Sequence, residues 1–468
     1  MSRGGLVISM LAAVAGCGGR ASHANAGATS GGASSLGGAS AGASGGASSL
    51  GGASAGATSG GGSSPDGSES ATACPRAYGA SWGFASSATG TGGTGGAVAS
   101  DLQGNVAYVV DQTGIVSRDA TGTMRWAQAL LNGATLPVTP MAPETDGGLF
   151  AGTVSAIAPA GDGGFFIVGE TPLDSAETAF VSRLDSQGGI SWTQVLSGLN
   201  GPPFYVVFDG SNQLWVLGVG IAPSTDPIGS TFASLALLGA DGRVVWQQRF
   251  GDPPSHIRPV GLALTSDGHA VIALRVDGGS ISIADPKADA TANRGLVASF
   301  NADGTRAWSR AIGQDPTDNI SGLTVGADGT IYAAGFTVRG GPSSTTILDP
   351  FLVALAEDGT VRWRRTYSLD AYANEPMLAA RPCGGLVIAA NTEMRTNSFP
   401  LGTLLIDVDD SGQEQRVRHI ANAYGTIAAH GSDGIVLVGQ LFGNLTFDSV
   451  QLSATGIGGN AFVARFLE

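Results

Sequence analysis

An all-β fold of four-stranded antiparallel units is what the sequence predicts for residues 74–468, on the basis of three recurring features. An apolar segment, a tight turn and a segment with a tryptophan recur along this region. Another pair of apolar segments around a turn precedes each copy. Asp-Gly dipeptides recur at the turns, where primed hairpin turns need residues that tolerate positive φ. Seven such units, repeated radially, predict a seven-bladed β-propeller.

The second half of each unit is the most regular part of the repeat. Its apolar segment begins at Ile115, Phe180, Phe232, Leu296, Phe351, Leu404 and Ala461. Five copies continue into a segment that carries a tryptophan, namely Trp126, Trp192, Trp246, Trp308 and Trp363. The sixth copy has Arg416 in place of the tryptophan, and the seventh ends with the chain. The seventh unit is therefore expected to lack its fourth strand.

A segment before the first unit, residues 77–84, is predicted to supply that missing strand. It carries Trp82, the kind of residue that the seventh unit lacks. We expect it to pair with the strand at 461–467 and to close the ring, because an open sheet edge invites pairing with other chains. The first strands of the units are rich in small residues such as Ala97, Ala99 and Gly261, as expected where inner strands crowd around an axis.

Residues 1–16 are predicted to be a lipoprotein signal peptide. Their apolar run, residues 6–14, is too short to span a bilayer as a stable helix. It ends in Val-Ala-Gly before Cys17, which resembles the bacterial lipobox, where the cysteine is acylated and becomes the first mature residue. The alternative is an ordinary secretory signal that is removed together with Cys17. Gly18 follows the cysteine, where an aspartate would indicate inner-membrane retention, so we expect an outer-membrane anchor facing the periplasm or the cell surface.

Residues 17–73 are predicted to be the lipidated cysteine and a tether without a packed core. The tether is almost wholly Gly, Ala, Ser and Thr, and a 14-residue unit is repeated in tandem at 31–44 and 45–58. Such a composition has too little apolar surface to offset the entropy of ordering. Two matches to Gly-x-Ser-x-Gly, at 38–42 and 52–56, lack the strand and helix that a nucleophilic serine requires.

The repeats resemble the beta-propeller repeat of bacterial secreted proteins and lipoproteins. The segment 351–363 carries the resemblance most fully, with its apolar strand, its Asp358-Gly359 turn and Trp363. The resemblance covers the repeats from residue 76 onward and implies the propeller fold. It implies no activity, because the family has no common catalytic residues.

The charge of the chain bears on its partners. The formal net charge is −14, and almost all charged side chains lie in 74–468. A field of this sign repels a phosphate backbone, so we expect no nucleic-acid partner. Contact with a membrane is expected only through the N-terminal lipid, and the protein is expected to be a monomer.

The sequence shows no constellation that predicts a catalytic, metal or cofactor site. The five histidines are scattered over different units or the tether, without the spacing of metal ligands. Residues 407–412 resemble the start of a calcium loop, but the twelfth position has no glutamate. Residues 90–95 match Gly-x-Gly-x-x-Gly, but an expected strand follows them instead of a helix.

Two classes of function remain. The first is a binding or scaffold module that presents loops on one propeller face to a protein or glycan partner. The connections at 171–179, 220–230, 277–294, 337–350, 394–402 and 441–459 vary in length and suit such a role. The second is a hydrolase or lyase with polar residues gathered at the axial pore. The inner strands consist mostly of Ala, Gly and Val, which favours binding.

Cys74 and Cys383 form an even pair once the anchor cysteine is set aside. Cys383 lies in an expected turn of the sixth unit, and Cys74 lies just before the closing strand of the seventh. An oxidising compartment permits a disulfide between these neighbouring units, so we predict one between Cys74 and Cys383.

Overall fold

The structure is a computed structural model. It describes residues 82–85, 95–101, 103–110, 114–131, 150–151, 153–173, 176–197, 199, 201–210, 212–222, 230–280, 294–313, 318–339, 347–369, 373–382, 384–392, 401–430, 434–447, 450–454 and 460–467. All of them belong to the compact unit that contains residues 74–468. Every element in this part of the chain is a β-strand. Since the described residues form no helix, they contain no helical segment that could cross a membrane.

The first two sheets are antiparallel meanders in which consecutive strands are hydrogen-bonded neighbours. The first contains β2 (Gly95–Ser100), β3 (Val106–Val110), β4 (Gly114–Arg118) and β5 (Met124–Leu131), with the short β6 (Phe150–Ala151) parallel to β5. The second contains β7 (Thr153–Pro159), β8 (Phe165–Leu173), β9 (Ala176–Leu184) and β10 (Ile190–Leu196).

The next sheet has eight strands because two four-stranded meanders join side by side. These are β11 (Pro203–Phe208), β12 (Gln213–Ala222), β13 (Ser230–Gly239) and β14 (Val244–Phe250), then β15 (Asp252–Leu264), β16 (Ala270–Ser280), β17 (Arg294–Phe300) and β18 (Arg306–Ile312). The join is a single parallel pairing of Thr231 with His256. There the Thr231 hydroxyl accepts a hydrogen bond from the Ile257 amide at 2.9 Å.

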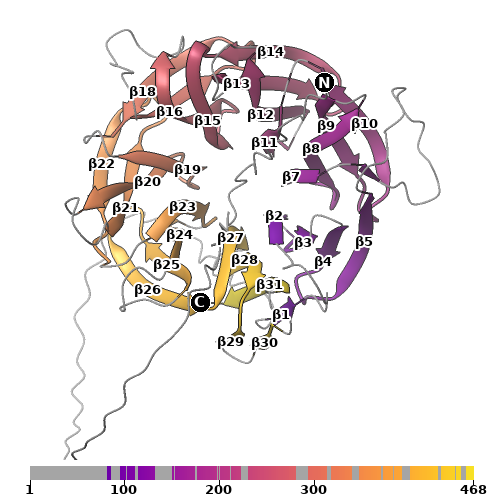
Figure 1. The fold of residues 1–468 in the computed structure, drawn as a ribbon, viewed down its shortest axis with the longest axis vertical. Helices are drawn as coiled ribbons and strands as arrows, with labels where there is room; N and C mark the ends of the chain where they lie inside the picture. Colours follow the sequence, from indigo (N-terminus) through magenta and orange to yellow (C-terminus); the bar gives the residue numbers. More distant parts are fainter. Residues whose placement is uncertain are drawn as a thin grey trace, which may run out of the picture. The chain divides into compact units, whose positions relative to one another are not determined.

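Two further four-stranded meanders follow. They are β19 (Asn319–Val325), β20 (Ile331–Arg339), β21 (Ile347–Leu355) and β22 (Val361–Thr366), and β23 (Ala373–Ala380), β24 (Leu386–Thr392), β25 (Gly402–Val408) and β26 (Glu414–Ala421). The predicted four-stranded antiparallel units are therefore present, and Figure 1 shows them arranged around one axis in a propeller-like fold.

The last sheet combines the two ends of the described chain. It contains β27 (Ala423–His430), β28 (Gly434–Leu441), β31 (Asn460–Leu467) and β1 (Trp82–Ala85). β1 pairs antiparallel with β31, from Trp82 opposite Arg465 to Ala85 opposite Phe462. The expected pairing of the N-terminal segment with the last strand is thus present for residues 82–85, whereas residues 77–81 lie outside the described residues.

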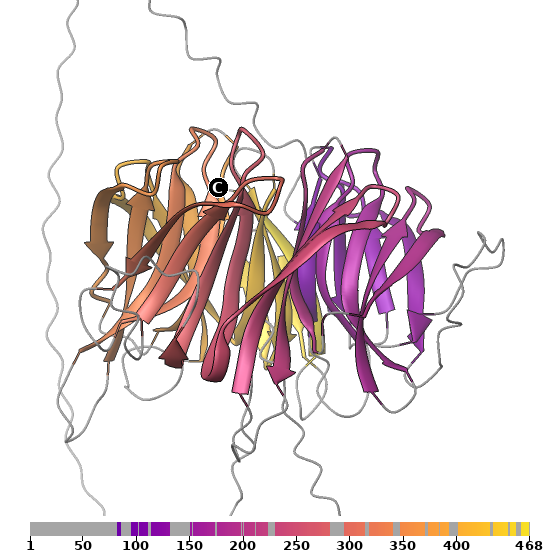
Figure 2. The same cartoon turned by 90° about the horizontal axis from the view of Figure 1, so that it is seen from above.

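The burial of the strands follows from their place in each sheet. Strands in the middle of a sheet face a neighbouring sheet on both sides, and β25 is accordingly buried along its whole length. The outer strand β22 is exposed at both ends and half-buried only at its two central positions. Figure 2 shows from the side that the strands run between the two faces of the unit.

The core consists of apolar clusters, most of which fill the space between neighbouring sheets. One joins the first sheet to the second through Trp126, Ile157 and Phe165. Another joins the first sheet to the last through Val106 and Val438. Each sheet therefore contributes to cores on both of its faces.

The tryptophans of the outer strands pack against turns of the following sheet. In each case the contact is a glycine in the turn between the third and fourth strands, since a Cβ on that glycine would lie within 3.3 Å of the ring. The pairs are Trp126 with Gly188, Trp192 with Gly242, Trp246 with Gly304, Trp308 with Gly359, and Trp363 with Gly412. Three of the indole nitrogens also donate hydrogen bonds to carbonyl oxygens next to these turns, those of Ala240, Ala302 and Glu357.

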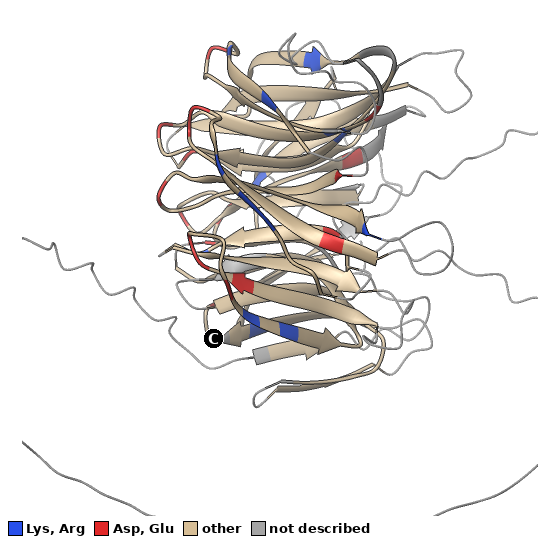
Figure 3. Ribbon diagram, turned by 90° about the vertical axis from the view of Figure 1, so that its left-hand side faces the viewer, with Lys and Arg blue, Asp and Glu red and all other residues tan. Residues whose placement is uncertain are grey.

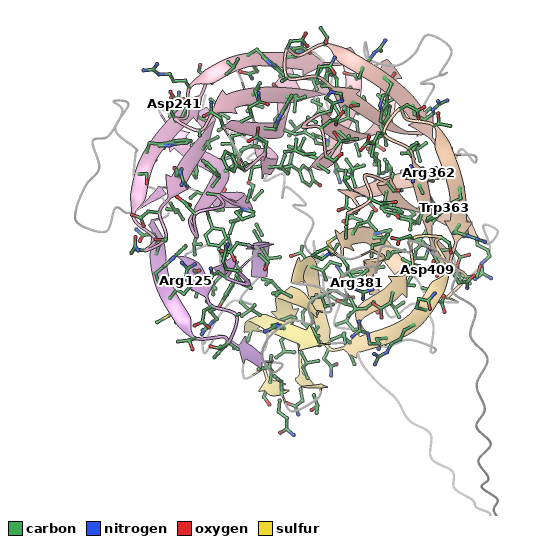
Figure 4. All side chains as sticks on the ribbon, turned by 180° about the vertical axis from the view of Figure 1, so that it is seen from behind. Arg125, Asp241, Arg362, Trp363, Arg381 and Asp409 are labelled. Atoms are coloured by element: carbon green, nitrogen blue, oxygen red, sulfur yellow. The ribbon has the colours of Figure 1, made fainter. Side chains whose placement is uncertain are left out.

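Arginines of the outer strands make similar contacts. Arg125 donates hydrogen bonds to the carbonyl oxygens of Gly163 and Ser186 in two turns of the next sheet. Arg364 instead binds within its own sheet, where it forms an ion pair at 3.0 Å with Asp318, a buried residue just before β19. Figure 4 shows Arg125, Arg362 and Trp363 near the rim of the unit.

A hairpin between β28 and β31 covers the outer part of the last sheet. It consists of β29 (Asn444–Phe447) and β30 (Val450–Ser453). Leu445, Val450 and Leu452 are buried in the core shared by the last two sheets. A Cβ on Gly83 of β1 would lie 2.9 Å from the Val450 side chain, so the hairpin packs directly against β1.

Candidate functional site

The residues that the sequence predicted for the anchor and the disulfide are not among those described. Cys17, Cys74 and Cys383 all lie outside the described residues. His23 does as well. The described histidines lie apart: His269 is near Asp267, with Nδ1 and Oδ2 3.5 Å apart, and His419 Nε2 is 3.4 Å from the Thr392 hydroxyl. Within the described residues, no three His, Cys, Asp or Glu side chains gather as metal ligands do.

The first strands of the sheets surround a central channel. One part of it is lined by Ala97 and Val98 of β2, residues 155–157 of β7, residues 204–206 of β11, and Thr426 and Ile427 of β27. A second part, farther along the same strands, is lined by residues such as Ala99, Ala158, Val207 and Ala379. As the sequence indicated, most of these side chains are small or apolar.

One end of this channel differs from the rest. A small cavity of about 40 Å³ there is lined by six residues with polar side chains, Tyr205, Arg258, Arg275, Ser321, Glu375 and Asn391, together with a few apolar ones. We call these six residues the channel-mouth cluster. They come from β11, β15, β16, β19, β23 and β24, which belong to four successive units of the repeat.

The connectivity places the channel-mouth cluster on a definite face. Each first strand runs from the face with the longer connections to the face with the tight Asp-Gly turns, for example from Thr153 to the turn after Pro159. Tyr205 and Glu375 lie in the first half of their strands, and Arg258 lies at the middle of β15. The cluster is therefore on the face with the longer connections. Figure 3 shows that acidic side chains concentrate in loops on one side of the unit, and the turn residues Asp241, Asp358 and Asp409 belong to the tight-turn face.

Glu375 is held in an unusual backbone conformation. Its φ is +46°, and only one other described residue besides glycine, Asn422, has a positive φ. The register of β23 and β24 shifts between Asn374 and Met377, which is a bulge. The Ser321 hydroxyl donates a hydrogen bond of 2.8 Å to the Pro376 carbonyl oxygen and so fixes the bulge to β19. Bulges redirect side chains, and strained backbone persists where the surroundings enforce it.

Tyr205 is electrostatically coupled to both charged neighbours. Burial raises the pKa of the Tyr205 phenol well above its usual value, the negative charge of Glu375 raises it further, and Arg258 lowers it by a smaller amount. The phenol is therefore protonated at neutral pH. It can donate or accept a hydrogen bond, but it is a poor general base.

Arg258 and Arg275 are direct cross-strand partners on β15 and β16. Like charges opposite each other destabilise a sheet by a few tenths to about 1 kcal/mol. Arg275 is compensated, since its Nε lies 2.6 Å from Asp277 Oδ1. Within the described part of the chain, neither Arg258 nor Glu375 takes part in a hydrogen bond or an ion pair. The mouth thus presents one positive and one negative group around a protonated phenol.

Sequence reasoning did not find this cluster. Its residues are spread from 205 to 391, and no spacing relates them. The available signal was the position of Tyr205, Arg258 and Glu375 on first strands that are otherwise small or apolar. The bulge at Glu375 leaves no mark in the hydrophobic pattern.

The chain was compared with known proteins. Its sequence matches no protein-family model and no curated protein. Among solved structures, it is similar to the Staphylococcus aureus virginiamycin B lyase (10% identity, 83% of this chain and 100% of that one, TM-score 0.46). It is also similar to a polysaccharide lyase (10% identity, 80% and 90%, TM-score 0.47) and to a puromycin hydrolase (16% identity, 77% and 52%, TM-score 0.44). At this level of similarity, the enzymatic activities of these proteins give no indication of what this chain does.

Proposed function

We propose that this chain is a lipid-anchored protein of the bacterial cell envelope that binds a protein or glycan partner at the channel mouth. Its fold in this proposal is a seven-bladed propeller closed by the N-terminal strand β1, carried on the tether 17–73. The observation that carries the proposal is Glu375, which the bulge holds beside Tyr205 and Arg258 with no partner in the described residues. Charged groups that remain uncompensated on a rigid scaffold suit ligand recognition.

The alternative, a hydrolase or lyase with its site in the axial channel, has less support. The raised pKa of Tyr205 disfavours it as a base, and the channel beyond the mouth is lined mainly by apolar side chains. A rigid ring with a polar mouth is sufficient for binding.

The test of binding uses the mature chain with Cys17→Ala, which cannot carry the lipid and so cannot sediment with membranes through it, together with its own cell-envelope material. Co-sedimentation with isolated outer membranes and envelope polysaccharide should weaken about tenfold or more in the double variant Arg258→Gln/Glu375→Gln. The matched control is Arg243→Gln/Glu414→Gln, which removes the same charges from exposed positions at the tight-turn face. Unchanged binding by the channel-mouth variant, or equal loss in the control, would contradict the proposal.

The anchor is tested separately. Acylation of Cys17 should direct the protein into the detergent phase, and Cys17→Ala should release it or leave its precursor uncut. A soluble mature protein in both cases would show that the lipobox interpretation is wrong.

We also propose the disulfide between Cys74 and Cys383, which would tie the segment before β1 to the unit formed by β23 to β26. Thiol labelling of the unfolded, unreduced protein should find neither of these cysteines reactive. Two reactive thiols in addition to position 17 would rule the bond out.

A further inference from the structure

We propose that the channel-mouth cluster recognises a neutral sugar residue through two adjacent hydroxyl groups. The inference rests on the proposed binding function and names the chemistry of its ligand. Its starting point is the pair of groups that have no partner in the described residues, the guanidinium of Arg258 and the carboxylate of Glu375.

The charges at the mouth balance. Arg275 is neutralised by Asp277, which leaves one positive and one negative group. A ligand with a net charge would place a like charge next to either the Arg258 guanidinium or the Glu375 carboxylate. The protein also carries a net charge of −14, which repels polyanionic chains. Both observations favour a ligand without net charge.

Adjacent hydroxyl groups match the two side chains. One hydroxyl donates to the Glu375 carboxylate, which is an acceptor only, while the oxygen of its neighbour accepts from the Arg258 guanidinium, which is a donor only. Both hydrogen bonds involve an ionised group and are therefore stronger than hydrogen bonds between neutral groups. The Tyr205 phenol, protonated at neutral pH, offers an amphipathic ring and a further donor in the same lining.

A zwitterionic ligand, such as an amino acid or a peptide end, would also be neutral overall. A hydroxyl both donates and accepts, so a pair of adjacent hydroxyls can match the two side chains in either order, whereas an ammonium can pair only with Glu375 and a carboxylate only with Arg258. Titration with triglycine tests the zwitterionic alternative.

The experiment is calorimetric titration of the full mature chain with maltohexaose, cellohexaose and mannohexaose. Hexagalacturonate and triglycine serve as the anionic and zwitterionic probes. At least one neutral hexasaccharide should bind, and its Kd should rise about tenfold or more in Arg258→Gln and in Glu375→Gln. It should be unchanged in Arg243→Gln and Glu414→Gln. Because the ligand is uncharged, its Kd should change less than about twofold between low and high salt.

Chemical modification of the ligand provides the sharpest test. Periodate cleaves the bond between carbons that carry adjacent hydroxyls, so oxidised and reduced hexasaccharide should no longer bind. Undiminished binding after this treatment, binding only of hexagalacturonate or triglycine, or no binding of any neutral hexasaccharide would overturn the inference. If envelope binding still depends on Arg258 and Glu375 in that case, the proposed binding function stands and only the sugar inference fails. If envelope binding does not depend on these residues either, both proposals fail.

Discussion

Glu375 occupies a backbone conformation that usually belongs to glycine, and its charge raises the pKa of the neighbouring Tyr205. A left-handed conformation costs a non-glycine residue about 1 kcal/mol or more. The Ser321–Pro376 hydrogen bond and the close approach of Gly322 to the Pro376 carbonyl oxygen hold the bulge in place. The position of this carboxylate therefore has a conformational cost that its neighbours offset.

Replacement of this residue should separate stability from binding. The substitution Glu375→Gly relieves the backbone strain and so raises the stability of the folded state. The greater conformational freedom of glycine in the unfolded chain offsets part of this gain in stability. We expect the free energy of unfolding to stay level or to rise by up to about 1 kcal/mol. Ligand binding should be lost at the same time. Chemical denaturation measures the first effect and titration the second; a marked loss of stability would show that Glu375 has a structural role instead.

The aspartates of the tight turns determine the response to acid. Asp119 Oδ1 accepts hydrogen bonds from the Thr121 hydroxyl and from the amides of Thr121 and Thr123. These bonds hold the pKa of Asp119 below its usual value, and those from the Ser411 hydroxyl and neighbouring amides do the same for the pKa of Asp409. The pKa values of Asp303 and Asp358 are lowered in the same way by hydrogen bonds from Thr305 and Thr360.

This predicts how stability depends on pH. The folded-state pKa of these carboxyls lies below the unfolded value of about 3.9, so their contribution is complete above that value. It is lost as the pH falls through the lowered folded-state values. A variant with four substitutions, Asp119→Asn, Asp303→Asn, Asp358→Asn and Asp409→Asn, keeps an acceptor oxygen at each turn. Its amide side chains do not ionise, so these positions no longer titrate. Its free energy of unfolding should fall less than that of the parent between about pH 7 and about pH 3. An equal fall in both proteins, with exposed Glu414→Gln as control, would contradict this prediction.

At the scale of the element, one contact recurs between neighbouring units. The indole ring of an outer-strand tryptophan packs on the turn between the third and fourth strands of the next unit. Trp308 packs on Gly359 and donates a hydrogen bond of 2.6 Å to the Glu357 carbonyl oxygen. The contact also explains the departure at Arg416. The sheet that follows β26 takes its outer strand from β1, so it has no turn between a third and a fourth strand for a tryptophan to cover. The β29–β30 hairpin fills part of the core there instead.

A double-mutant cycle measures this contact. Trp308→Ala should cost about 2 kcal/mol, because the ring is only half-buried. Gly359→Ala should cost about 1 to 3 kcal/mol, since its φ is +79° and the added Cβ would lie 2.6 Å from the ring. The double variant should lose less than the sum, by at least about 0.5 kcal/mol, because removal of the ring relieves the clash.

Gly210→Ala is the matched control for this cycle. Gly210 has the same φ of +79°, but nothing lies within 4 Å of an added Cβ. It should show the cost of the backbone conformation alone and should be additive with Trp308→Ala. Additivity of the Trp308 and Gly359 variants as well would mean that the ring and the turn are energetically independent.

The sequence was sufficient for the repeated elements and insufficient for the candidate site. Asp-Gly turns and the tryptophan positions are local patterns, and they located the hairpins correctly at residues such as Asp303 and Asp358. The pairing of β1 with β31 followed from a missing strand at one end of the repeat and an extra one at the other. The cluster of Tyr205, Arg258 and Glu375 depends on a bulge and on side-chain directions in three separate units, and neither is encoded in a local pattern.

At the scale of the whole molecule, the contacts between the first and last sheets matter most for the proposed seven-bladed ring. Arg465 is fully buried and donates a hydrogen bond of 2.6 Å to the Ala120 carbonyl oxygen in the first sheet. Arg118 lies over the Phe84 ring of β1 at 3.5 Å from its centroid. These contacts cross the junction that β1 completes.

Removal of residues 76–85 should therefore destabilise the unit as a whole. Without β1, the edge of β31 and the apolar side chains of the β29–β30 hairpin would be exposed. We expect the melting temperature to fall by about 5 °C or more in calorimetry. Deletion of ten residues from the tether, 31–40, is the control and should leave it unchanged. A truncated chain that melts like the parent would contradict closure by β1.

The position of β1 also has a mechanical consequence. A force transmitted along the chain from its N-terminal side reaches β1 before any other described strand. Among the described residues, four pairs join β1 to β31, whereas eight join β31 to β28. Under tension the shorter of these two ladders should yield first, so we expect β1 to detach from β31 while the other sheets keep their neighbours. An envelope protein anchored at Cys17 and held by a ligand at the channel mouth would thus respond to stretching at one defined place, and relaxation would let the same four pairs form again.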